Sequence, residues 1–502
     1  MREHLVTYFE EHHKLVEPGA LSLILEHREP LDLSRRLIES AGPDSPFVTV
    51  EMVERALVAA RSGAFRTTSR PMGPSAPALG ADPAIAALTY VLIHEGFIPS
   101  RGPSEPLVAY SGLFSSRFRA LARLMKGRPE LAGQRPIRDV RRGDGSTSVV
   151  GLVRDVRQTP EKHHIILHLE DETGAMEVFV PRDSAPAKLT FLPDEVVGLV
   201  LSVPRDSDKI PRAVSVHRPD VPASRPVGRS TRPSRALFLS DLHIGSRSFM
   251  DGPWGALMEF LRGRGPKPEV AREIAHVVIA GDLVDGIGIY PNQESDLLIG
   301  DVFEQYEELG RRLRELPERL NVVLLPGNHD AVCPAEPQPP LPEEFGAKLP
   351  PNVRSVANPS TFALDGVVVE AYHGRAFDDL IPALPGMSYA RPTEVMKRML
   401  AMRHLAPIYG GRTPLAPLAR DGLVIDPVPD ILVTGHAHTY GVDQYRGILL
   451  LNASTWQAET EYQRMRNISP VPARAAVVDL TDLSVESFDF SEREGRSGGL
   501  PA

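Results

Sequence analysis

The stretch AHVVIAGDLVD, residues 275–285, decides the fold of the second half of this chain. Its apolar run has the length of a buried strand, and the glycine and aspartate that follow end it abruptly. Similar runs end in Asp, Asn or His elsewhere: RALFLS before Asp241, NVVLLPG before Asn328, GVVVEAY before His373 and DILVTG before His436. Amphipathic segments such as 302–320 lie between the runs. Strands that alternate with helices predict a layered α/β domain.

The polar residues that follow these runs are the expected site. In α/β sheets, ligands gather at the carboxyl ends of the strands. A pair of divalent metals needs a bridging anionic ligand together with several other ligands, and Asp282 is the natural bridge. Imidazole, carboxylate and amide donors suit Mn²⁺, Fe or Zn better than Mg²⁺ or Ca²⁺. The predicted metal ligands are Asp241, His243, Asp282, Asn328, His373, His436 and His438.

Each of these motifs is weak when taken alone. A single DLH or GNHD is usually a helix cap, a turn or a polar loop. The ordered series at successive strand ends argues against that purely structural interpretation. A protein that had lost the metal site would be expected to lack some of these ligands, and this sequence has all seven.

The series D-x-H, G-D, G-N-H, H and G-H-x-H resembles that of the calcineurin-like metallophosphoesterase superfamily, whose domain is a two-sheet αββα sandwich. The resemblance implies that Asp241, His243, Asp282 and His438 hold one metal, and that Asp282, Asn328, His373 and His436 hold the other. It also implies that His329 faces the scissile phosphate without binding metal. We therefore assign His329 to transition-state stabilisation and leaving-group protonation. Asp285 resembles a carboxylate that orients this histidine in related phosphatases.

The rest of the chain is divided by composition and pattern. We expect a helical N-terminal module at 1–60, a Ser/Pro/Gly-rich linker at 61–82 and a helical segment at 83–134 that leads to a barrel. Alternating strands over 135–216 resemble an OB-type barrel. A second linker covers 217–234, the phosphoesterase domain covers 235–490, and 491–502 is a tail. The predicted fold class is therefore a multidomain α/β (α+β) protein, with an OB-type β-barrel and a two-sheet domain.

Bulk properties limit the possible functions. The 502 residues suggest two or three domains, and a net charge of −9 excludes a global basic field for nucleic acid. The single cysteine, Cys333, rules out an intramolecular disulfide and fits a reducing compartment. The N-terminus lacks an apolar signal core, and no apolar run is long enough to span a bilayer. We expect a cytoplasmic, nucleoid-associated protein that has no membrane partner.

Longer segments narrow the family. GDLVDGIGIYPNQE, RHLAPIYGGRTPLAP, NASTWQAETEYQ and YSGLFSSRFRALARLMKGR resemble the small subunit of archaeal family-D DNA polymerases. The resemblance spans about residues 100 to 490. It implies a proofreading 3′→5′ exonuclease that uses two divalent metal ions, with Mn²⁺ as the expected metal. It also implies two partners, a large polymerase subunit and the 3′ end of a DNA primer.

Four residues outside the metal shell are candidate DNA contacts. Tyr290 and Gln293 lie in the IYPNQE loop just beyond Asp282, and Tyr290 is placed to stack on a base. Arg403 and His404 are candidates for phosphate contacts. The alternative for all four is a structural role.

The OB-type segment and the N-terminal module are predicted to bind proteins. The aromatics of the OB-type segment are only Phe179 and Phe191, which makes it a poor stacking surface and favours docking to the large subunit. The N-terminal module is expected to bind another replication protein.

Two rival functions remain. One is a different metallophosphoesterase, such as a repair nuclease or a phosphoprotein phosphatase. Gly286 and Asp330 stand where such phosphatases carry Arg and Glu, and repair nucleases place the catalytic domain first. The other rival is a scaffold subunit without activity, against which the intact ligand series argues.

Overall fold

The computed structural model describes residues 90–97, 106–206, 210–465 and 469–491, together with scattered positions before residue 54. The chain divides into two compact units, Met1–Ala81 and Asp82–Ala502. Within the first unit, strand β1 (Leu15–Val16) pairs in parallel with β2 (Phe47–Val48). The predicted helical module at 1–60 lies mostly outside the described residues, and the predicted linker at 61–82 and the tail beyond residue 491 lie entirely outside them.

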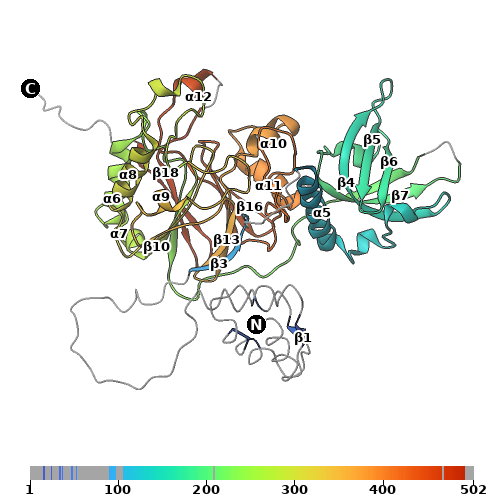
Figure 1. Ribbon diagram of the computed structural model, residues 1–502, viewed down its shortest axis with the longest axis horizontal. Coiled ribbons are helices and arrows are strands. Elements are labelled where there is room, and N and C mark those ends of the chain that lie inside the picture. Colours follow the sequence, from blue (N-terminus) through green and yellow to red (C-terminus); the bar gives the residue numbers. More distant parts are fainter. Residues whose placement is uncertain are drawn as a thin grey trace, which may run out of the picture. The chain divides into compact units, whose positions relative to one another are not determined.

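A closed barrel occupies the first part of the second unit, with the strand order β4-β5-β6-β8-β7 (Figure 1). Its strands are β4 (Gly145–Gln158), β5 (Ile165–Asp171), β6 (Gly174–Val180), β7 (Val196–Val203) and β8 (Arg212–His217). Alternate residues such as Leu167 and Leu169 fill the interior, as the period-2 pattern predicted. Short 3-10 turns flank these strands: η2 (Pro129–Leu131), η3 (Ile137–Asp139) and η4 (Ala185–Lys188).

Helix α5 (Pro106–Met125) joins the barrel to the rest of the unit. Arg117 in the middle of this helix is fully buried, and its Nε donates to Asp421 Oδ2 at 2.6 Å. Tyr110 Oη donates to the carbonyl of Leu415 at 3.0 Å. A buried charge is tolerated only when it is paired in this way, so the contact holds α5 against the C-terminal domain.

That domain contains two six-stranded sheets in the described part of the chain, with the orders β12-β11-β10-β9-β18-β19 and β16-β17-β15-β14-β13-β3. The first sheet consists of β9 (Arg235–Leu239), β10 (Ile274–Ala280), β11 (Asn321–Leu325), β12 (Val353–Ser355), β18 (Arg474–Asp479) and β19 (Val485–Asp489). The second consists of β3 (Tyr90–Glu95), β13 (Ser360–Leu364), β14 (Val367–Ala371), β15 (Ile431–Thr434), β16 (Gly441–Tyr445) and β17 (Ile448–Asn452).

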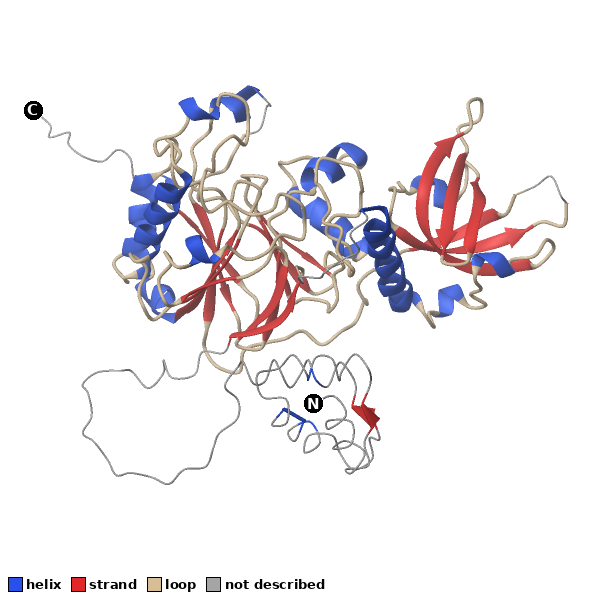
Figure 2. Cartoon of the chain, viewed as in Figure 1, coloured by secondary structure: helices blue, strands red, loops and turns tan. Residues whose placement is uncertain are grey.

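Helices cover the outer faces of both sheets, which gives an α–β–β–α arrangement (Figure 2). On β10, Val277 and Ile279 pack toward the helices, whereas Val278 and Ala280 pack into the core shared by the two sheets. Both faces are therefore apolar, which explains the uninterrupted hydrophobic runs in the sequence. The fold class predicted from the sequence is confirmed. The helices and turns of this domain are α6 (Asp251–Leu261), α7 (Pro268–Glu273), η5 (Gln293–Ser295), α8 (Val302–Leu313), α9 (Glu343–Gly346), α10 (Phe377–Ala383), α11 (Pro392–Met402) and α12 (Glu461–Met465).

The prediction of helix throughout 83–134 is wrong for Tyr90–Glu95. These six residues form β3, which pairs antiparallel with β13 at the edge of the second sheet. A short apolar run does not distinguish strand from helix, and Tyr, Val and Ile favour a pleated surface where one is available. The C-terminal domain therefore includes a strand from before the barrel.

None of the helices in the described ranges combines the length and the apolar character that crossing a membrane requires.

A buried carboxyl in the second sheet gives a testable pH dependence of stability. Burial raises the pKa of Glu370 from 4.5 to about 7, although Thr361 Oγ1 donates a hydrogen bond to it. Between these two pKa values the folded state binds more protons than the unfolded state, so stability falls as pH rises through about 7. We expect Glu370→Gln to be stabilising by about 2–3 kcal/mol at pH 8 and nearly neutral at pH 4.5. Melting temperatures of both proteins at the two pH values test this, and an equal difference at both would contradict it.

Candidate metal centre

The candidate ligands come from the carboxyl ends of parallel strands in both sheets. Strands β9, β10 and β11 run parallel in the first sheet, and β14 and β15 run parallel in the second. Each strand ends just before a polar residue, and the two sets of ends meet at one edge of the sandwich. The ligand residues that follow these strands are Asp241 and His243 after β9, Asp282 after β10, Asn328 after β11, His373 after β14, and His436 and His438 after β15.

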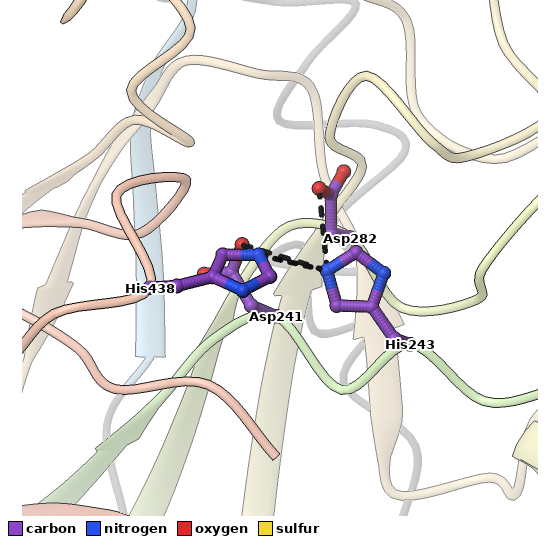
Figure 3. Close-up of side chains that lie close together, drawn as sticks. All are labelled: Asp241, His243, Asp282 and His438. Atoms are coloured by element: carbon purple, nitrogen blue, oxygen red, sulfur yellow. Dashed lines mark hydrogen bonds and ion pairs between the residues drawn. The ribbon is translucent and has the colours of Figure 1, made fainter. Parts of the chain in front are cut away.

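The first donor group consists of Asp241, His243, Asp282 and His438, whose ligand atoms all lie within 4.8 Å of one another (Figure 3). His438 Nε2 is 3.3 Å from Asp241 Oδ1, and His243 Nε2 is 3.7 Å from Asp282 Oδ2. Two carboxylates and two imidazoles that converge in this way fit a transition-metal ion.

A second donor group shares Asp282 with the first and adds His373 and His436. Asp282 Oδ1 is 3.3 Å from His373 Nε2, and Asn328 Oδ1 is 3.1 Å from the same nitrogen. Asp282 thus presents Oδ2 to one group and Oδ1 to the other. This is the arrangement that a carboxylate bridging two metals requires.

The charges of the centre favour cations. Burial by itself raises the pKa of Asp282, but the surrounding histidines outweigh it and hold that pKa well below the ordinary value. His438 likewise outweighs burial and lowers the pKa of Asp241. Burial lowers the pKa of His373, but Asp282 and Asp241 raise it to about 10. The carboxylates are therefore anionic, and a divalent cation would displace the proton that they stabilise on His373.

The backbone at the centre is strained. Five ligand residues have left-handed φ angles between 49° and 62°, namely Asp241, His243, Asp282, His436 and His438. Each such conformation costs about 1–3 kcal/mol outside glycine and persists only where the surroundings impose it. A Cβ at Gly327 would overlap Asp282 Oδ1, and one at Gly435 would overlap Asp241 Oδ2. Gly327 and Gly435 therefore leave the space that the carboxylates of Asp282 and Asp241 occupy, in addition to allowing the chain to turn.

A second layer of side chains and carbonyls orients the histidine rings. His243 Nδ1 is 3.0 Å from Asp285 Oδ1, and His373 Nδ1 donates to the carbonyl of Ala280 at 2.9 Å. On the second-sheet side, His436 Nε2 is 3.3 Å from Asp378 Oδ1, and His438 Nδ1 is 2.6 Å from Gln463 Nε2. Such partners set the orientation of metal-binding imidazoles in known sites.

The role assigned to Asp285 from the sequence needs correction. Its carboxylate contacts His243, a candidate ligand, and accepts from Gln457 Nε2 at 3.0 Å. His329 is held instead by the main chain, because its Nδ1 donates to the carbonyl oxygen of Asp285 at 2.8 Å. Its Nε2 therefore faces the pocket, 3.9 Å from Asp282 Oδ2.

The four candidate DNA contacts separate into one at the pocket and three buried elsewhere. Tyr290 lines the pocket. Gln293 is fully buried, where its Nε2 donates to the carbonyl and the carboxylate of Asp285. Arg403 donates to the carbonyl of Ile425, and His404 pairs with Asp421, so both are buried and absent from the pocket lining. Burial and these hydrogen bonds favour the structural alternative for the three side chains.

The pocket above the two donor groups has a volume of about 390 Å³. Sequence reasoning missed several residues that support or line it: Arg375, Asp378, Tyr389, Arg412, Gln457 and Gln463. Arg412, Gln457 and Gln463 lie in segments that carried the family resemblance. Their side chains left no signal of their own, because hydrogen-bond partners far apart in sequence are visible only in three dimensions.

Comparison with known proteins decides the family. A protein from Archaeoglobus fulgidus named DNA polymerase II small subunit is 43% identical over 380 residues, which is 75% of this chain and 75% of that protein. The chain belongs to the family of DNA polymerase II small subunits. A second member, from Methanothermobacter thermautotrophicus, is 39% identical over 386 residues, 75% of this chain and 78% of the relative. The family resemblance drawn from the sequence is confirmed.

The small subunit also matches the family model that describes the B subunits of DNA polymerases alpha and epsilon, over residues 236–442, a range that contains all seven candidate ligands. A solved structure titled as that of a novel archaeal phosphodiesterase aligns with 51% of the small subunit and 98% of its own chain, at 10% identity and a TM-score of 0.25.

Proposed function

We propose that this small subunit is a 3′→5′ exonuclease that hydrolyses DNA phosphodiesters with two divalent metals and works beside a large polymerase subunit. The observation that carries the proposal is Asp282, an ionised and buried carboxylate that points one oxygen to each donor group. The imidazole, carboxylate and amide donors favour Mn²⁺, with Fe or Zn as alternatives. When bound, the metals would neutralise phosphate charge and lower the pKa of the attacking water.

The protein's own residues would position the phosphodiester and its leaving group. Asp241, His243, Asp282 and His438 would hold one metal, and Asp282, Asn328, His373 and His436 the other. His329 donates through Nδ1 to the Asp285 carbonyl, so its Nε2 faces the pocket and, in the protonated ring, would donate to the leaving-group oxygen. Tyr290 lines the pocket, where its ring could stack on a terminal base.

The proposed function is tested by copurifying the chain with a large subunit and supplying Mn²⁺ and a primer with a mismatched 3′ end. Release of 3′-labelled mononucleotides supports a 3′→5′ exonuclease. Release from a 5′ label first, or activity that survives Asp282→Ala or His438→Ala, would refute it. A pair that copurifies but digests no end would favour the scaffold function instead.

The Asp285 carboxylate contacts the candidate ligand His243 and should strengthen metal binding. We expect Asp285→Asn to lower metal affinity by about 10–100-fold, because a carboxylate partner orients a ligand imidazole and increases its basicity. The carbonyl that holds His329 is unchanged in this variant, so activity should return at raised Mn²⁺. Metal titration of the initial rate measures both effects. A rate deficit that persists at saturating metal would show that the carboxylate serves His329 after all.

A further inference from the structure

Part of the pocket lining consists of residues that are not themselves candidate metal ligands. Arg375 precedes α10, Asp378 lies in the first turn of α10, Tyr389 precedes α11, and Arg412 follows α11. All of them belong to connections of the second sheet, whereas Ile289 and Tyr290 come from the loop after β10 of the first sheet. Both sets line the same pocket as His243, Asp282, Asn328, His436 and His438, so a substrate bound there would lie within reach of both.

Charge distinguishes this side of the pocket. Arg375 and Arg412 are the arginines among the described lining residues, and no lysine lines it. Asp378 accepts from Tyr389 Oη at 2.5 Å and faces His436. Asp282 and Asp285 are likewise engaged with histidines. Arg412 lies close enough to Asp378 to help lower the pKa of that carboxyl, but both guanidinium groups keep donors for an incoming anion, and they suit the oxygens of a phosphate.

The loop that carries Arg412 is held by its main chain. The Asp379 carboxylate accepts from the backbone N–H groups of Arg412 and Thr413 at 2.6 and 2.9 Å. Gly411 packs so closely on Asp379 that a Cβ would overlap the carboxylate. The Arg412 side chain itself is exposed. Because the backbone is fixed, less entropy is lost when the exposed guanidinium binds a ligand.

Arg375 is fixed by one of its five donors. Its Nη1 donates to the carbonyl of Pro334 at 2.8 Å, and the other donors remain for a ligand. Arg375 follows the candidate ligand His373 by two residues, so its position is coupled to the metal centre. Tyr389 adds a ring surface beside the arginines, and ring surfaces accept bases of any sequence.

We infer that Arg375 and Arg412 bind the phosphate on the 5′ side of the penultimate nucleotide, with Tyr389 against the intervening nucleoside. The ligand is a single-stranded DNA end, because a nucleoside can pack against the Tyr389 ring only after it has left the duplex stack. The inference rests on the proposed function and adds a binding subsite beyond the scissile phosphate. A frayed, mismatched end would reach this subsite more easily than a paired one.

The test compares a natural oligonucleotide with one that carries a neutral methylphosphonate at that linkage. In the wild type, the neutral linkage should slow release of the terminal nucleotide by roughly 10–100-fold, the effect of losing charge-assisted hydrogen bonds. In the Arg375→Gln/Arg412→Gln variant, the natural substrate should be slowed as much and the methylphosphonate should add no further loss. Equal methylphosphonate penalties in both proteins would overturn the inference. Bis(4-nitrophenyl) phosphate lacks the second phosphate, so the double variant should slow its hydrolysis much less than that of the natural oligonucleotide.

Binding separates failure of this inference from failure of the proposed function. The anisotropy of a labelled single strand is measured with the full chain in the presence of Mn²⁺. All proteins in this assay carry His329→Ala, which stops turnover. The double arginine variant should bind more weakly, with a log–log salt slope smaller by roughly 1–2. Arg420→Gln, an exposed arginine outside the pocket lining, is the matched control and should change neither quantity. If the double arginine variant binds more weakly but the wild type shows no nuclease activity, the subsite is supported and the exonuclease function is wrong. If the double variant binds as tightly as its parent, the subsite is wrong.

Discussion

Replacing Asp282 with alanine is expected to abolish binding of both metals and to reduce phosphodiester hydrolysis by about a thousandfold or more. The reason is geometric, because its two carboxylate oxygens face different donor groups. No other described side chain belongs to both groups. With metals bound, Asp282 would contribute a ligand to each of them.

Variants of residues that belong to only one donor group serve as controls for Asp282→Ala. Asp241 belongs to the first group alone and His373 to the second alone. Asp241→Ala and His373→Ala should therefore each retain about one metal per chain, whereas Asp282→Ala should retain none. Elemental analysis after desalting gives the stoichiometry, and circular dichroism checks the fold. If Asp282→Ala kept as much metal as the other two variants, the bridging role would be wrong.

Replacing His329 with alanine is expected to leave the metals bound and to lower kcat by about 10²–10⁴-fold. His329 is absent from both four-ligand sets, and its imidazole is held by the carbonyl of Asp285 rather than by a metal ligand. Burial lowers the pKa of His329, so the ring needs the negative charge of a bound phosphate beside it to hold the proton that it gives to the leaving group. Metal stoichiometry and single-turnover rates measure the two expectations separately.

The leaving group provides the control for His329. A 4-nitrophenyl ester needs little protonation as it departs, so its hydrolysis should be much less sensitive to His329→Ala than that of DNA. Raised Mn²⁺ should not restore activity, in contrast to Asp285→Asn. Parallel loss of metal and activity would show that His329 is a ligand and would end its assignment to the leaving group.

The sequence alone determined the layered fold and the residues that supply the centre. Strands buried on both faces read as continuous apolar runs, and the chain exposes ligands where parallel strands end. These are local signals, so Asp241, Asp282 and His436 could be found without coordinates. Their division into two groups came from family resemblance, and the structure brings the members of each group together.

Only the tertiary structure decided how the remaining polar residues are used. Asp285 lies close to His329 in both interpretations, but its carboxylate meets His243 while its carbonyl meets His329. Arg403 and His404 looked available in sequence and are buried against Ile425 and Asp421. Tyr90–Glu95 became a strand because β13, far along the chain, offered a sheet edge. Local pattern fixes which face of an element is apolar, whereas a hydrogen-bond partner depends on distances between segments that only the folded chain brings together.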